Sequence, residues 1–171
     1  PAGKENWKVS AGGVLVIGLN IIQDWSNEGQ ELKWLENCLA RAAENYIFVA
    51  LHAPPYSSHK HGEGKNTPHD RLLKKCRKYV LPLCEKYNVT AILSGHVHAY
   101  ERCELPGNIT SITSGGAGAK LYDKSSDSEK FNPYSSIFRK SHNFLIIEAS
   151  SRNCTLKAFD DKENIIDTRT W

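Results

Sequence analysis

The sequence predicts an α/β fold built on a mixed sheet, and two patterns support this class. Three short apolar runs, at residues 13–19, 46–51 and 89–94, have the length and continuity of buried strands. Segments with helical spacing separate these runs, and strands alternating with helices indicate an α/β layer. Four β-rich runs with turn residues between them follow, at 109–113, 144–149, 155–159 and 165–170. We therefore expect a sheet that is mixed at one side.

Two helices are expected between the apolar runs. Residues 30–45 carry Leu32, Leu35 and Leu39 at spacings of three and four, which is the pattern of a helix with one apolar face. A second helix is expected from Thr67, a good capping residue, to about Tyr87, with a break near Pro82. The segment 119–141 is polar and irregular, so a long loop is expected there.

The composition of the chain limits which classes of partner are expected. The 171 residues are enough for a single domain, and the formal charge of +3 is a mild excess of scattered bases. The densest basic run, Lys74–Lys78, is interpreted as a solvated helix face, and we favour this over a nucleic-acid partner. Because the sequence contains no apolar run of about 18 residues, a membrane partner is not expected either.

Three further features bear on the origin of the chain. It begins at Pro1 and contains no methionine, which predicts a processed, trimmed or partial chain that has lost any targeting signal. The five cysteines are an odd number without metal-ligand spacing. Three Asn-x-Thr triplets occur, at Asn88, Asn108 and Asn153, and they favour a secreted or lysosomal origin over a cytoplasmic one.

Histidines follow two of the predicted strands. His52 comes directly after the second apolar run, and Gly95-His96-Val97-His98 follows the third. In open α/β sheets, ligands bind beyond the carboxyl ends of the strands. Neutral imidazole is a common ligand of zinc, iron and similar metals, so these histidines predict a metal site at that edge.

These segments resemble the calcineurin-like metallophosphoesterases. Residues 51–56, Leu-His-Ala-Pro-Pro-Tyr, and residues 94–102, Ser-Gly-His-Val-His-Ala-Tyr-Glu-Arg, look like the last two metal-binding blocks of that family. The second block is especially similar to the purple acid phosphatase branch. The helix at 30–39 and the glycine-rich segment at 113–119 resemble the family's flanking segments in the right order.

The resemblance implies a two-metal phosphoester hydrolase. Its fold would be a β-sandwich flanked by helices, and its metals would be two ions of iron, zinc or manganese. A hydroxide generated at the metals would attack the phosphorus of a phosphate ester. His52 and His96 match ligands of one metal, and His98 matches a ligand of the other. A histidine in the following loop contacts the phosphate or the leaving group; His61 is the first choice, His59 the second, and His69 ranks behind both.

The carboxylate blocks of the family are missing. Neither Asp-x-His, Gly-Asp nor Gly-Asn-His occurs in the sequence, and neither Asp24 nor Asp70 matches a family block. Residues 1–171 are therefore interpreted as the C-terminal portion of one phosphoesterase domain with an incomplete site. We expect this portion to bind metal weakly, to hydrolyse little, and to need its N-terminal half or a second copy. The alternative is a shortened, non-catalytic relative that binds a partner.

Two other motifs are assigned structural roles. Glu101 and Arg102 are expected to brace the histidine loop rather than to react. The glycine-rich segment from Ser114 to Ala119 lacks the Lys-Ser/Thr of a phosphate-binding loop, so it is interpreted as a turn.

Overall fold

A large mixed sheet forms the centre of the structure, a computed structural model that describes residues 5–23, 25–26 and 29–171. Pro1 and Asp24, considered above, lie outside the described residues. The sheet order is β1-β2-β3-β4-β6-β5-β7. Strands β2, β3, β4 and β6 are parallel, whereas β1, β5 and β7 are antiparallel to their neighbours. The bounds are β1 Trp7–Ala11, β2 Val14–Leu19, β3 Tyr46–Leu51, β4 Ala91–Ser94, β5 Tyr100–Leu105, β6 Ile109–Ser114 and β7 Ser135–Arg139.

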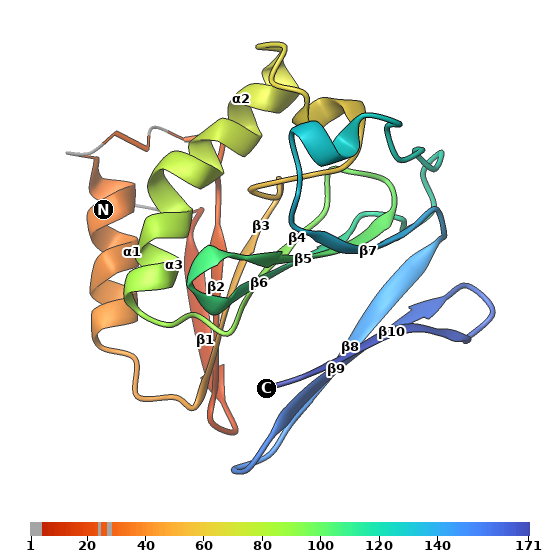
Figure 1. Cartoon of the computed structure of the whole chain (residues 1–171). Helices are drawn as coiled ribbons and strands as arrows, with labels where there is room; N and C mark the ends of the chain where they lie inside the picture. The colour runs from red at the N-terminus through yellow and green to blue at the C-terminus, as the bar shows by residue number, and fades with distance from the viewer. Residues whose placement is uncertain (1–4, 24, 27–28) are drawn as a thin grey trace.

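The large sheet lies between a layer of helices and a second, smaller sheet (Figure 1). The second sheet has the order β10-β9-β8 and is antiparallel. Its bounds are β8 Asn143–Ala149, β9 Cys154–Asp160 and β10 Ile165–Thr170. The helices are α1 Gln30–Ala40, α2 Pro68–Lys75 and α3 Leu81–Lys86, with short turns η1 Lys60–Gly62, η2 Cys76–Val80, η3 Pro106–Asn108 and η4 Ser128–Lys130. The predicted mixed α/β class is confirmed.

The alternation of side chains along the strands explains the three layers. Leu15 and Ile17 of β2 pack into the core beneath the helices, whereas Val14 and Val16 face the smaller sheet. Successive side chains of a strand point to opposite faces, so an unbroken apolar run fits a strand covered on both sides. The smaller sheet adds Leu156 and Ala158, both fully buried, against the large one.

The helices differ in length from the prediction. Helix α1 ends at Ala40, five residues before the expected Asn45. Helix α2 begins as expected, because the Thr67 hydroxyl accepts from the Asp70 N–H at 3.2 Å and the Asp70 carboxylate accepts from the Thr67 N–H at 2.9 Å. The expected break near Pro82 takes the form of a π-helical segment, η2, because proline cannot donate to the preceding turn.

Three strands were not predicted. Strand β1 is exposed along its length. Its apolar and polar residues alternate over only five positions, so its pairing with β2 across Gly12-Gly13 is what defines it. Strand β5 has the sequence Tyr-Glu-Arg-Cys-Glu-Leu, in which charged residues interrupt the apolar ones, and it follows directly on the histidine motif, so no apolar run marks it. Strand β7 lies inside 119–141, so the expectation of one long loop there was wrong; β5 supplies its pairing partner.

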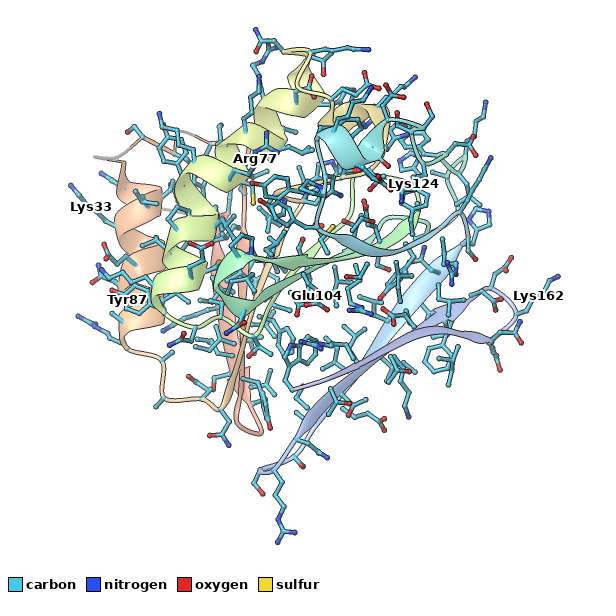
Figure 2. The ribbon with its side chains drawn as sticks, in the orientation of Figure 1. Lys33, Arg77, Tyr87, Glu104, Lys124 and Lys162 are labelled. Carbon is cyan, nitrogen blue, oxygen red and sulfur yellow. The ribbon has the colours of Figure 1, made fainter. Side chains whose placement is uncertain are left out.

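Apolar surface remains open between the two sheets. A cavity of about 430 Å³ is lined by residues of both, including Val16, Phe48 and Ile147. Phe144 and Ile146 of β8, each 44% exposed, add apolar surface on the opposite, outer face of the smaller sheet. Elsewhere in the contact between the sheets, Glu104 of β5 (labelled in Figure 2) lies 3.7 Å from the Arg169 guanidinium of β10, which links the sheets.

Two findings concern the earlier expectations about cysteines and membranes. All five cysteines lie within the described residues; each is buried and none forms a disulfide. Among the helices of the described residues, none combines the length and apolarity needed to span a bilayer.

Candidate metal centre

The carboxyl ends of two neighbouring parallel strands bring His52 and His96 together. Leu51 of β3 pairs with Ser94 of β4, so the residues that follow each strand start side by side. The Gly95 N–H donates to the His52 carbonyl at 3.1 Å and continues this pairing past the strands. As a result, the His96 Nδ1 atom lies 3.0 Å from the His52 Nε2 atom.

The loop after β4 turns sharply to present His96 and His98. His96 itself adopts a left-handed conformation with φ 65°, whereas Gly95 does not have a positive φ. The strained position of the turn is therefore the histidine and not the glycine before it, and such strain is common at functional sites. Fully buried Val97 anchors the loop from below. The His98 Nδ1 atom lies 2.9 Å from the Lys120 carbonyl, and its ring stacks on Tyr122 at a centroid distance of 4.3 Å.

Three more histidines reach the same place from other segments. The His59 Nδ1 atom lies 2.9 Å from the Asp123 carbonyl, and the His59 ring also stacks on Tyr122, with centroids 4.5 Å apart. His61, in η1, stacks on His69 with centroids 4.2 Å apart. The His69 Nδ1 atom lies 3.1 Å from the His96 Nε2 atom.

His69, ranked last from the sequence, is thus central to the cluster. The sequence placed it correctly in the first turn of a capped helix but offered no sign that this turn lies over the strand ends. Ligand nitrogens of His61, His69 and His96 all lie within 4.8 Å of one another. Six of the seven histidines of the chain belong to this cluster; His142 is the exception.

The electrostatics of the cluster keep two rings neutral. Burial, followed by the nearby His52, His69 and His61 side chains, lowers the pKa of His96 to about 4. Burial, ahead of the neighbouring His59 and His69, also lowers the pKa of His61 to about 4. Neutral imidazole is the form that binds metal ions, so both rings have a free lone pair near neutral pH.

A family model agrees with this arrangement. The model described as "Calcineurin-like phosphoesterase" matches residues 5–100, which contain β1 to β4 and the histidines at their ends. The chain belongs to the calcineurin-like phosphoesterase family.

Relatives within this family are acid phosphatases. Tartrate-resistant acid phosphatase type 5 of Oryctolagus cuniculus is 38% identical over 85 residues, half of this chain and 23% of that protein. Purple acid phosphatase 23 of Arabidopsis thaliana is 30% identical over 107 residues, 61% of this chain and 22% of that protein. The chain thus spans less than a quarter of the length of these relatives.

A solved structure shows the same fold over the whole chain. The purple acid phosphatase PPD1 from yellow lupin (Lupinus luteus) seeds superposes with a TM-score of 0.85 and 19% identity. The match covers 98% of this chain and 32% of the lupin chain. The predicted resemblance to the purple acid phosphatase branch is therefore confirmed for the fold.

The side chains of this calcineurin-like phosphoesterase fit part of a metal centre. Among the residues that the structure describes, the buried His59 Nε2 and His61 Nδ1 atoms have no hydrogen-bond partner, which is costly unless a ligand binds them. The ring nitrogens of His52 and His96 lie 3.0 Å apart, a spacing that two ligands of one ion adopt. Within the described residues, the close group of ligand atoms holds imidazoles and no carboxylate, so the bridging ligand of a metal pair is not supplied here.

Gly115 is expected to be essential for the shape of the His96–His98 loop. A Cβ atom at Gly115 would lie 2.1 Å from the Val97 carbonyl oxygen, so Gly115→Ala must displace the loop backbone. We expect a loss of about 2 kcal/mol in the free energy of unfolding by urea, as for other overpacked sites. Amide chemical shifts of Val97 should change as well.

Gly95→Ala is the matched control for this prediction. A Cβ atom there meets nothing closer than the His52 carbonyl oxygen at 3.9 Å, an ordinary contact. Equal stability of the two variants would contradict the assignment of Gly115 as a spacer beneath the loop.

Proposed function

We propose that the protein is a metal-dependent phosphoester hydrolase in which residues 1–171 form the C-terminal portion of one phosphoesterase domain. The observation that carries this proposal is the gathering of six histidines at the carboxyl ends of parallel strands in a family of phosphoesterases. His52 and His96 would hold one metal and His98 the other, and iron, zinc or manganese fits the imidazole donors. Two bound metals supply Lewis-acid activation of the phosphate and of water.

The remaining residues of the site suit an anionic substrate. A pocket of about 590 Å³ opens beside the histidines. Its charged lining residues are three lysines and two carboxylates: Lys60, Lys120, Lys124, Glu63 and Asp123. Figure 2 shows Lys124 on the loop at this side of the molecule. The lysines would attract a phosphate ester, and His61, with His59 behind it, would contact the phosphate or donate a proton to the leaving oxygen.

The missing carboxylates would come from outside these 171 residues. An open hollow of about 580 Å³ lies over the carboxyl ends of β2, β3, β4 and β6, where Leu19, Leu51, Ser94 and Ser114 line it. Together with the apolar opening between the sheets, this hollow supports docking of an N-terminal half of the same domain, or otherwise of a second copy. The isolated portion should then hydrolyse little.

A turnover assay on the intact parent chain tests the proposal. With manganese or with iron and zinc, a chromogenic phosphomonoester should be hydrolysed, and a chelator should stop the reaction. His96→Ala should lower the rate about a hundredfold or more, because it removes a metal ligand. His142→Ala is the control. Within the described residues, the His142 ring forms its hydrogen bond with the Gly116 carbonyl and lies outside the histidine cluster. Metal-independent turnover, or full activity in His96→Ala, would contradict the proposal. Absence of any turnover in the intact parent chain would favour the non-catalytic alternative.

We further infer a secreted or lysosomal setting. Asn88, Asn108 and Asn153, the asparagines of the three Asn-x-Thr triplets, are all exposed and therefore accessible to glycosylation. The parent chain expressed through a secretory pathway should lose mass on treatment with an N-glycosidase; an unchanged mass would argue against this setting.

A further inference from the structure

The contact between His69 and His96 has the dimensions of a metal site. Their Nδ1 and Nε2 atoms are 3.1 Å apart. Two nitrogens bound to one zinc ion at about 2.0–2.1 Å lie roughly 2.9 to 3.4 Å apart for bond angles between a right angle and the tetrahedral value. The two nitrogens therefore need little movement to bind one ion.

His61 supplies a third nitrogen to the same place. A ligand nitrogen of each of the three residues lies within 4.8 Å of the other two. The His61 Nδ1 atom is buried and has no hydrogen-bond partner, so a ligand there would relieve an unfavourable burial. The rings of His61 and His69 lie nearly parallel, at 7°, so one ring must turn for both lone pairs to meet an ion. His69 is exposed and has room to turn.

Other histidines of the cluster are less well placed for a third bond. The Nδ1 atom of His98 is engaged by the Lys120 carbonyl, and His98 lies outside the group of three close nitrogens. His52 contacts the Nδ1 atom of His96, whereas His69 contacts the Nε2 atom on the other side of the His96 ring. An ion beside His69 therefore uses the Nε2 atom of His96 and excludes His52.

We propose that this chain binds one Zn²⁺ ion through His61, His69 and His96, using no residue from outside it. Three imidazoles with an open fourth position form a known type of zinc site. The site shares His96 with the two-metal centre proposed above but takes a different set of ligands, and it does not depend on that proposal. A three-ligand site in the 171-residue chain also differs from the weak metal binding that the sequence predicts for it.

A zinc titration of the 171-residue chain tests this site. Competition with a chromogenic chelator should give one ion per chain, and Co²⁺ in its place should show the strong visible bands of a four-coordinate ion. His69→Ala and His61→Ala should each weaken binding about tenfold or more, because losing even an outer partner of a metal site costs 10–100-fold. His142→Ala is the control and should bind as the parent does, because His142 lies outside the cluster.

Folding and ligand identity can be separated in the same experiment. His69 is exposed, and its Thr67–Asp70 cap is retained in His69→Ala, so circular dichroism should be unchanged. Unweakened zinc binding in a folded His69→Ala variant would overturn the proposal. If His52→Ala weakens binding and His69→Ala does not, the ion lies with the ligands of the two-metal centre; this site is then rejected while the proposed function stands.

Discussion

Asp167→Ala is expected to lower the free energy of unfolding by about 3 kcal/mol, because it removes the acceptor of the Tyr100 hydroxyl and one of the two carboxylate partners of Arg102 in the contact between the sheets. The Tyr100 hydroxyl donates to the Asp167 carboxylate at 2.6 Å, and the Arg102 Nε–H donates to the same oxygen at 2.7 Å. The Asp167 side chain is 5% exposed and the Arg102 side chain 14%. Burial and the contact with Asp167 raise the pKa of Tyr100 above its ordinary value, so its hydroxyl remains a donor.

Two comparisons separate this network from a general loss of charge. Asp161→Ala, at the exposed turn between β9 and β10, should change the free energy of unfolding by less than about 0.5 kcal/mol. The double variant Asp167→Leu with Arg102→Met should recover much of the stability that Asp167→Ala loses. In the double variant both members of the ion pair become apolar, whereas Asp167→Ala leaves the Arg102 charge without this partner. Urea denaturation measures all three variants. An Asp167→Ala variant as stable as Asp161→Ala would show that the smaller sheet is held by apolar packing alone.

The same network explains why strand β5 was missed from the sequence. Apolar runs predict strands well where both faces of the sheet are covered. Strand β3 is such a case, and its bounds match the prediction. In β5, Arg102 and Glu104 face the smaller sheet and are paired there with Asp167 and with each other. Their partners lie more than sixty residues away in β10 or within the strand itself, so no local pattern reveals the burial.

The sequence predicts the histidines of the candidate metal centre that follow strands. It does not predict the positions of those that depend on the path of a loop. His52 and His96 follow apolar strands, and parallel strands bring their carboxyl ends to one edge. His69 starts a helix whose cap was predicted, but its position over that edge depends on the path of the preceding loop. That path is set by buried contacts of Ser58 with Glu101 and Asn132, which join distant segments.

Glu101 is expected to be the residue that holds the histidine loop in place. Because side chains alternate along β5, Glu101 points away from the smaller sheet and lies beneath the loop that carries His59 and His61. Its carboxylate accepts from the Ser58 N–H at 3.0 Å and from the Asn132 amide at 3.0 Å, and the residue is 1% exposed. The Asn132 amide also donates to the Ser58 hydroxyl at 3.1 Å, which closes the network.

Glu101→Ala should therefore lower the free energy of unfolding by about 3 kcal/mol, since a buried N–H and a buried amide lose their acceptor. Glu101→Gln should cost less, because it keeps one oxygen but turns a donor toward the Asn132 amide or the Ser58 N–H. Glu148→Ala, which removes an exposed carboxylate on β8, should cost at most about 0.5 kcal/mol.

A purely structural role for Glu101 and a positioning role differ in one measurement. If Glu101 positions the loop, Glu101→Gln should shift the ring resonances of His59 and His61 under conditions where the variant remains folded, while those of His142 stay unchanged. The reason is that the Ser58 N–H lies one residue from His59 and three from His61, so a change at this contact moves both rings. Unchanged histidine resonances in a destabilised variant would show that Glu101 supports the core and leaves the placement of the histidines to η1 and Tyr122.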